Sequence, residues 1–468
     1  MKLDLAVING IVYVDGGFRE VDIGIKDEKF AVICERGMLP DSDKTIDAKG
    51  KYVMPGGIDT HVHFRDPGHA ERGTFYTESQ AAVAGGTTTI LEHPISSPPQ
   101  YNKEILDNRK KIAEERQGVV DYAFYAAAGG QYPEEITKVA KEGIVAFKTF
   151  LHEAPEGRDD EFIGLTMAND YEIYVGMKEV AKTGLLLASH AENNDLIQGL
   201  IDYYRKEGKV TPEYHCLSRP PISEYSTVQK MLLFAKETGC RLELVHISTP
   251  EAMEMAKQAK LEGQEVFLET CPHYLLLTEE ELPKHGPYAK CNPPLRGKET
   301  VDKIWDYVID GTVDFIGSDH GPFLAEEKEK GKDDIFKAPA GFVGIDLRLP
   351  LMLNEVAKGE RGLTLERVVE LCSINPAKIF DIYPRKGTIQ PGSDGDLVIF
   401  DMNDKFTIDW KKNYSGSKEI AKVYDGKELN CKINYTIIRG KVVMQDGEVD
   451  PEKDGTKGWG KLILRNDN

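Results

Sequence analysis

Cysteine pairs are absent from this sequence. The seven cysteines are odd in number, they stand singly, and no two of them form a C-x-x-C motif. This pattern argues against a disulfide framework, and we expect reduced thiols that are mostly packed in the interior. The seven residues are Cys34, Cys216, Cys240, Cys271, Cys291, Cys372 and Cys431.

Long apolar runs and excess positive charge are also lacking. No stretch approaches the roughly 20 apolar residues that span a bilayer, and Met1 to Leu5 leads into strand-like sequence instead of a cleavable signal. We therefore expect a cytoplasmic protein without membrane contact.

The 59 Lys and Arg residues are outnumbered by 78 Asp and Glu residues, which gives a net charge of −19. Because phosphate binding draws on clustered Lys and Arg, we expect no nucleic-acid partner but a metal ion or a small polar ligand.

Both ends of the chain have the pattern of short strands. With 468 residues, 40% of them hydrophobic, the chain is long enough for one large domain and a smaller module. Residues 1–54 form alternating runs separated by Asn-Gly and Gly-Gly turns, and the alternation returns in residues 386–401 and 431–449. We predict a β-sandwich built by both termini, from residues 1–54 and 381–468, the second part including a C-terminal tail.

The region between them, residues 55–380, alternates strand-like and helical segments. The strand-like segments are rich in apolar and β-branched residues, as buried parallel strands are. The helical segments show helix periodicity, and a glycine follows some of them. This alternation predicts an α/β fold, a (β/α)₈ barrel of the TIM type. The strand-like segments are residues 87–93, 143–151, 184–192, 241–249, 265–273 and 313–320.

His61 and His63 stand at the start of this region, in PGGIDTHVHF. Two residues apart on a strand, they point to the same face and can bind one ion through imidazole nitrogens. Taken alone, this pattern fits a packed or surface pair of histidines as well as a metal site.

Four further candidates follow at strand ends. Lys148 ends the apolar run GIVAFK, where an unpaired ammonium is unfavourable; a salt bridge, a snorkelling side chain or carbamylation by CO₂ would each resolve this. His190 and His246 end apolar strands, and each alone fits a core histidine as well as a metal ligand. Asp319 suits a metal ligand, a proton shuttle or a capping carboxylate. Because six such residues stand at successive strand ends, we predict a metal site.

Several motifs surround these residues. They are H-V-H, F-K, S-H-A-E-N, V-H-I-S and S-D-H, together with RPPISE, ETCPHYLLLT, KCNPPLR and YPRKGTIQPGSDGDLVIFD. In these motifs the chain resembles the cyclic-amide hydrolase branch of the amidohydrolase superfamily over nearly its whole length, with allantoinases as the nearest match. The resemblance implies a barrel with a flanking β-sandwich, and a homo-oligomer that is a dimer or a tetramer.

The resemblance also implies two divalent metal ions per chain, usually zinc. The implied assignment is His61, His63 and Asp319 on one ion, His190 and His246 on the other, and carbamylated Lys148 as the bridge between them. A bridging hydroxide is the implied nucleophile, and Asp319 is implied to pass its proton to the departing ring nitrogen.

Residues beside the metal ligands decide between substrates in this branch. Arg65, two residues after His63, suits a substrate carboxylate or carbonyl and resembles an arginine of dihydroorotases, although a structural salt bridge is equally compatible. Ile95 replaces the asparagine that accompanies this arginine in dihydroorotases. Glu153 replaces the tyrosine typical of hydantoinases and dihydropyrimidinases. Asn292 in KCNPPLR precedes two prolines and suits either substrate binding or a plain turn.

The HFRDPG opening, the apolar residue after Pro94 and KCNPPLR resemble allantoinases. Hydrolysis of the small cyclic amide allantoin to allantoate is therefore our first choice. A hydantoinase or dihydropyrimidinase, whose YPRKGTI signature is well matched, and a dihydroorotase are the alternatives. The competing class is a non-catalytic scaffold protein related to dihydropyrimidinase, against which the intact set of ligands argues.

Overall fold

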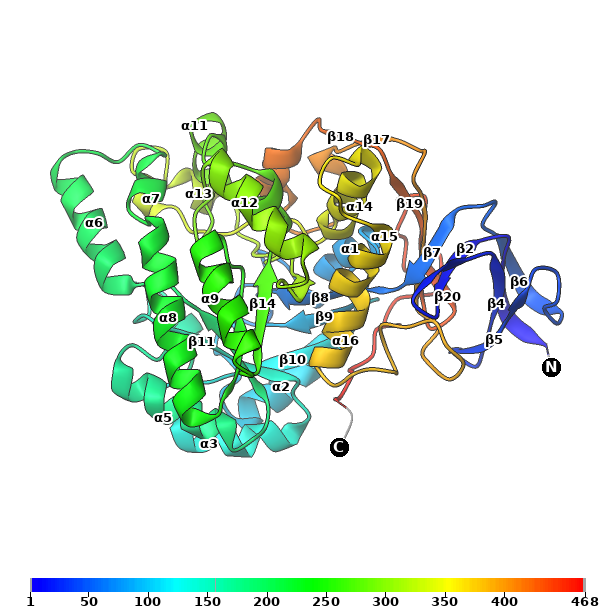
Figure 1. Ribbon diagram of the computed structural model, residues 1–468, viewed down its shortest axis with the longest axis horizontal. Helices are drawn as coiled ribbons and strands as arrows, with labels where there is room; N and C mark the ends of the chain where they lie inside the picture. Colours follow the sequence, from blue (N-terminus) through cyan, green and yellow to red (C-terminus); the bar gives the residue numbers. More distant parts are fainter. Residues whose placement is uncertain (1, 156, 466–468) are drawn as a thin grey trace.

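A computed structural model describes residues 2–155 and 157–465 (Figure 1). It contains the predicted (β/α)₈ barrel of eight parallel strands in sequential order, beside a smaller β-sandwich on the right of Figure 1. The fold prediction is confirmed. The barrel strands are β8 (Gly57–Val62), β9 (Thr87–Glu92), β10 (Asp121–Ala127), β11 (Ala146–Phe150), β12 (Leu186–His190), β13 (Arg241–Leu244), β14 (Val266–Thr270) and β15 (Phe315–Ile316).

The barrel closes between its first and last strands. Neighbouring strands pair in parallel register, for example Lys148 of β11 with Ala188 of β12. Beyond the end of β15, Val62 and His320 form a parallel bridge, and the His63 N–H donates to the His320 carbonyl at 2.8 Å. Closure therefore places the chain after β15 beside the end of β8.

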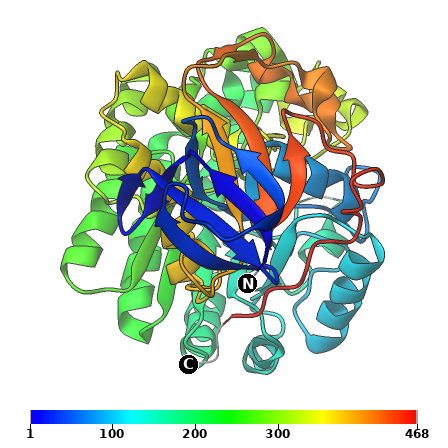
Figure 2. The ribbon, with the colours of Figure 1, turned by 90° about the vertical axis from the view of Figure 1, so that its right-hand side faces the viewer.

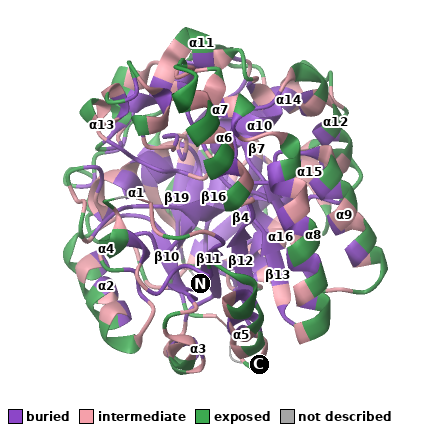
Figure 3. Cartoon of the chain, turned by 90° about the vertical axis from the view of Figure 1, so that its left-hand side faces the viewer, coloured by how far each residue is buried: buried purple, intermediate pink, exposed green. Residues whose placement is uncertain are grey.

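The barrel strands are apolar because both of their faces are covered. Every residue of β8 to β12 is buried, and exposed residues gather on the outer helices (Figure 3). The strand β10 was not among the predicted strands. Its sequence DYAFYAA contains three alanines, and alanine has a low strand propensity, so its pattern is weak.

Helices alternate with the strands and form the outer layer. Asn102, Asn169 and Asn193 begin three of them, each accepting a hydrogen bond from a backbone N–H of the first turn. The helices are α1 (Phe75–Ala84), α2 (Lys103–Glu115), α3 (Pro133–Val139), α4 (Asp159–Phe162), α5 (Asp170–Ala181), α6 (Asn194–Lys206), α7 (Tyr214–Leu217), α8 (Pro221–Thr238), α9 (Pro250–Leu261), α10 (Pro272–Leu276), α11 (Glu281–His285), α12 (Lys298–Ile309), α13 (Ala325–Glu329), α14 (Arg348–Lys358), α15 (Leu365–Val369) and α16 (Asn375–Ile379). Short helical turns are η1 (Ala140–Glu142), η2 (Gly286–Ala289), η3 (Ile335–Lys337), η4 (Glu370–Ile374), η5 (Trp410–Lys412) and η6 (Lys418–Tyr424).

The β-sandwich consists of two sheets whose apolar faces share one core. The first sheet is built by the N-terminal segment alone, from β5 (Lys29–Glu35), β4 (Val21–Lys26), β1 (Leu3–Ile8) and β6 (Ser42–Asp47) in that order. The second joins both ends of the chain (Figure 2). Its order is β20 (Lys441–Gln445), β19 (Lys432–Ile438), β16 (Leu397–Asp401), β7 (Tyr52–Pro55), β2 (Ile11–Val14) and β3 (Gly17–Arg19). The strands β17 (Phe406–Thr407) and β18 (Glu428–Leu429) form a separate pair.

We propose residues 1–54 and 381–468 as the sandwich and residues 55–380 as the barrel. The second sheet joins the two parts of the sandwich, since Val398 of β16 lies opposite Met54 of β7. The C-terminal tail returns to the barrel, where the Tyr122 N–H of β10 donates to the Lys461 carbonyl at 3.0 Å (Figure 2). The tail therefore packs on the barrel and not within the sandwich sheets.

No helix in the described ranges is both long and apolar enough to span a membrane.

Lys386 is buried where the barrel meets the sandwich. Its Nζ donates to Asp121 of β10 at 2.5 Å and to Asp396, next to β16, at 2.6 Å, and it lies 3.1 Å from Asp394. Arg439 also pairs with Asp121. These carboxylates raise the pKa of Lys386 against the effect of burial. One ammonium thus neutralises carboxylates from both parts of the molecule.

We expect Lys386→Met to lower the free energy of unfolding by about 3–5 kcal/mol, because it leaves the buried Asp396 without its cation and Asp121 with Arg439 alone. Denaturant unfolding of the metal-loaded protein measures the loss. The exposed Lys412→Met variant is the matched control, with an expected change within about 0.5 kcal/mol. Equal stability of the two variants would contradict this role of Lys386.

Candidate metal centre

The six predicted ligands lie at or near the C-terminal ends of five barrel strands. His61 lies in β8, Lys148 in β11 and His190 at the end of β12, whereas His63, His246 and Asp319 follow β8, β13 and β15. In a barrel of parallel strands, these ends meet at the face where catalytic side chains gather.

Three residues at this face have a backbone conformation with positive φ, which residues other than glycine rarely adopt. The φ angles of Arg65, His246 and Asp319 are 60°, 43° and 49°. Such conformations are unfavourable by about 1–3 kcal/mol each and concentrate at functional sites. The sequence pattern gave no sign of them.

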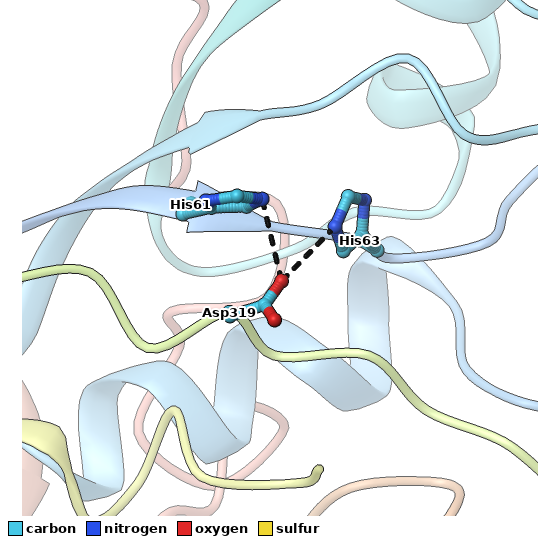
Figure 4. A group of neighbouring side chains, drawn as sticks. All are labelled: His61, His63 and Asp319. Carbon is cyan, nitrogen blue, oxygen red and sulfur yellow. Dashed lines mark ion pairs between the residues drawn. The ribbon is translucent and has the colours of Figure 1, made fainter. Parts of the chain in front are cut away.

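His61, His63 and Asp319 converge on one point (Figure 4). Asp319 Oδ1 lies 3.3 Å from His61 Nε2 and 3.4 Å from His63 Nε2, and one ligand atom from each residue lies within 4.8 Å of the others. Burial lowers the pKa of both histidines well below the usual value, so both imidazoles are neutral. Neutral imidazoles and a carboxylate are typical zinc ligands.

Glu269 of β14 fixes the ring of His61. His61 Nδ1 donates to Glu269 Oε1 at 2.7 Å, so the lone pair of Nε2 faces the Asp319 carboxylate. Two acceptors facing each other repel, and a cation between them removes the repulsion. The Thr60 hydroxyl and the His246 backbone N–H also donate to Glu269, at 2.9 and 3.0 Å. Glu269 was not among the residues predicted from the sequence, although it lies within the strand-like segment 265–273.

His190 and His246 form a second pair at the same face. His190 Nε2 donates to Glu192 Oε2 at 2.9 Å, which leaves the lone pair of Nδ1 directed at His246 Nε2, 3.1 Å away. Arg219 also donates to Glu192 Oε2, at 2.5 Å. The carboxylate therefore fixes the tautomer of His190, which is the arrangement that holds a metal-binding histidine in place.

Lys148 is fully buried, and its Nζ has no hydrogen-bond partner among the described residues. Burial lowers the pKa of Lys148, which favours the neutral amine, while the Asp319 carboxylate opposes this shift. A neutral amine is the form that reacts with CO₂. The resulting carbamate would be an anion that can bind nearby cations, so the buried side chain would no longer be without a partner. The residues present therefore fit a pair of divalent ions.

The five other predicted ligands border a cavity of about 130 Å³. Both predicted substrate-binding residues, Arg65 and Asn292, lie on its wall. Arg65 is buried, lies 3.5 Å from Glu161 Oε2 and covers the ring of Phe323 at 4.8 Å, so it forms a salt bridge and faces the cavity as well. Burial lowers the pKa of Arg65 to about 9. Asn292 Oδ1 is buried without a partner among the described residues.

Other residues of the wall were not predicted to face a substrate. Arg158 and Arg219 add positive charge, and Ile95, Phe150 and Phe162 add apolar surface. His152 also lies on the wall, whereas Glu153 does not. Phe150 lies in β11, but the positions of the others depend on how the segments between the strands fold, which has no periodic signal in the sequence.

The chain is similar to known proteins over nearly its whole length. A model of the amidohydrolase family matches residues 52–443. The chain belongs to the amidohydrolase family. It is 38% identical to an L-hydantoinase of Paenarthrobacter aurescens over 99% of this chain and 98% of that protein, and 33% identical to an allantoinase of Deinococcus radiodurans over 96% and 97%. The solved structure of an L-hydantoinase (dihydropyrimidinase) from Arthrobacter aurescens superposes with a TM-score of 0.93 at 36% identity, covering 99% of this chain and 100% of that one. Members of the amidohydrolase family are metal-dependent, and His61, His63 and Asp319 form a group that could hold a metal ion here.

We expect Glu269→Gln to weaken metal binding by about 10- to 100-fold, because the neutral amide no longer polarises His61 Nδ1–H. Metal content measured after dialysis against graded chelator concentrations reports the change. The control is Glu265→Gln, an exposed carboxylate just before the same strand. If the two variants retain metal equally, Glu269 does not support the ligands.

Proposed function

We propose that the chain is a two-metal hydrolase that opens the ring of a cyclic amide, with allantoin as its first substrate and allantoate as the product. The observation that carries the proposal is the convergence of His61, His63 and Asp319 beside His190 and His246 at the border of one small cavity. The names of the relatives support the class of reaction, since both allantoinases and hydantoinases hydrolyse cyclic amides.

The proposed ligand assignment follows the two pairs of histidines. We assign His61, His63 and Asp319 to one divalent ion, His190 and His246 to the other, and carbamylated Lys148 to both. Zinc is the metal that we propose, because it accepts imidazole and carboxylate ligands together. Ions held there would supply Lewis-acid chemistry, polarising the scissile carbonyl and lowering the pKa of a water molecule.

The chain's own residues supply orientation and proton transfer. Among the described residues of the wall, the carboxylates are Glu192 and Asp319, and Glu192 is engaged by His190 and Arg219. Asp319 is thus the carboxylate available to take the proton of the attacking water and deliver it to the ring nitrogen. The water oxygen bonds to the carbonyl carbon, the C–N bond breaks, and the nitrogen leaves as N–H.

The cavity favours a small ring with a polar substituent. A cavity of about 150 Å³ holds one benzene ring, so about 130 Å³ suits a single small ring. Allantoin is a hydantoin ring that carries a ureido group, and polar contacts to that group are offered by Arg65, Arg158, Arg219 and Asn292.

A hydantoin with an apolar substituent is the second candidate. Ile95, Phe150 and Phe162 on the wall and the 38% identity to an L-hydantoinase favour it.

The proposal also covers the class of protein, its assembly and its location. The intact ligand set and the catalytic relatives favour an enzyme over a scaffold protein. Arg65 favours a dihydroorotase activity, whereas Ile95, which replaces the asparagine of dihydroorotases, argues against it. A homo-oligomer, either a dimer or a tetramer, and a cytoplasmic location stay predictions from the sequence.

We expect Lys148→Ala to abolish hydrolysis of allantoin, because the carbamate that bridges the ions cannot form. Short carboxylic acids such as acetate or propionate should restore part of the activity, since they fit the vacated space and supply a bridging carboxylate. The exposed Lys141→Ala is the control for surface lysines. Full activity of Lys148→Ala, with both ions bound, would refute the bridge.

Steady-state kinetics with allantoin, hydantoin, 5-benzylhydantoin, dihydrouracil and dihydroorotate test the substrate. We expect kcat/KM to be highest for allantoin, by at least about tenfold over 5-benzylhydantoin. A tenfold difference corresponds to the free energy that one strong polar contact contributes to binding of the transition state. Preference for 5-benzylhydantoin would favour the hydantoinase alternative. Preference for dihydroorotate, or no turnover of any ring by metal-loaded protein, would overturn the proposal.

A further inference from the structure

Two lysines near the cavity are buried without a carboxylate. Lys328 of α13 is 0% exposed and Lys290, just after η2, is 6% exposed. Neither forms an ion pair among the described residues. Burial lowers the pKa of Lys328 to about 7 and that of Lys290 well below its usual value. A buried amine in such a place is unfavourable unless its N–H groups all find acceptors.

Backbone carbonyls supply the acceptors of Lys328. Its Nζ donates to the carbonyls of Lys290, Pro339 and Gly341 at 3.1, 3.0 and 2.8 Å. An ammonium has three N–H bonds, and all three are used. A single side chain thus joins the chain after η2 to the segment that follows η3.

Lys290 completes the same arrangement from the other side. Its Nζ donates to the carbonyls of Ile335 and Ala338 at 2.8 and 2.6 Å. Its own carbonyl accepts both from Lys328 and from the Gly341 N–H, which lies 3.0 Å away. The two lysines therefore bind four carbonyls of the segment 335–341.

This segment has little regular structure of its own, since η3 covers only its first three residues. Ala340 and Gly341 at its end border the cavity, as does Asn292, two residues after Lys290. Between Lys290 and Asn292, the Cys291 carbonyl accepts from His215 Nε2 at 2.8 Å. The wall that Asn292, Ala340 and Gly341 form is thus held through contacts to Lys290 and Lys328.

We propose that Lys290 and Lys328 are positioning residues for the substrate: they clamp segment 335–341 to residues 290–292 and so fix the wall against which the substrate ring binds. The clamp explains why two amines are buried where no anion neutralises them. Neither lysine reaches the metal ligands through any hydrogen bond of the described residues, so its effect is on ring binding and not on metal binding. The identity of the bound ring rests on the proposed function.

Lys328→Met in the metal-loaded protein tests the clamp. The wall contacts the ring both before and during the reaction, so its loosening should raise KM for allantoin at least about tenfold and change kcat by less than about threefold. Amide hydrogen exchange of residues 335–343 should become at least about tenfold faster, with metal content unchanged. Lys337→Met, an exposed lysine in the same segment, should change none of these quantities.

The outcomes separate positioning from general stability. A variant that only loses folded protein lowers kcat and leaves KM unchanged, and this result, or unchanged exchange in residues 335–343, would overturn the clamp. If Lys328→Met does not fold, Lys328→Arg, which keeps cationic donors in a different geometry, is compared by the same two measurements. Hydrogen exchange needs no substrate, so it tests the clamp even if allantoin is not hydrolysed.

A chemical rescue distinguishes the amine from the packing of its stem. In Lys328→Ala, n-propylammonium should restore slow exchange and low KM, whereas n-propanol, of similar size, should not restore them. Rescue by both compounds to the same degree would show that volume alone matters, which would also overturn the role of the amine.

Discussion

Closure of the barrel is the constraint on which the site depends. The parallel bridge between Val62 and His320 places the chain after β15 against the end of β8, and Asp319 is thereby brought within 3.3 Å of His61. These residues are far apart in the sequence, so no local preference draws them together. If the sheet opened at this seam, the three ligand atoms would separate even with every strand intact. The buried hydrogen bonds of Glu269 connect β14 to His61 of β8 and to the His246 backbone at the end of β13.

The sequence predicted the barrel and the six ligand candidates because both produce strong patterns. Buried parallel strands are apolar throughout, so a histidine, lysine or aspartate at their ends stands out. The strand β10 escaped because alanine is not typical of strands. Glu269 escaped because one carboxylate inside a strand-like segment has no distinguishing neighbour, and its meaning depends on contacts to β8 and β13. The loops that carry Arg158 and Ala340 have no period at all, so the composition of the cavity wall needed the structure.

Buried charge is distributed in three ways across this molecule. At the junction of barrel and sandwich, Lys386 is surrounded by carboxylates, and the ions neutralise one another. At the candidate metal centre, burial lowers the pKa of His61, and Lys148 Nζ has no hydrogen-bond partner among the described residues, so added cations suit the site. Around the cavity wall, Lys328 relies on backbone carbonyls alone. The first and third arrangements are complete without a ligand, whereas the second leaves Lys148 without a hydrogen-bond partner among the described residues. The scaffold and the site therefore place opposite demands on the same types of residue.

The pairing of β7 with β16 has a consequence for the folding of the chain during its synthesis. The strand β7 ends at Pro55, but its partner begins at Leu397 and β19 follows later still. At the usual pace of translation, about 5–20 residues per second, the ribosome needs on the order of tens of seconds to supply that partner. During this time the edge of β7 and the apolar face beside it have no native cover. The nascent chain therefore has to be kept from pairing with other chains, by chaperones or by its own charge, until nearly all of it has emerged from the ribosome.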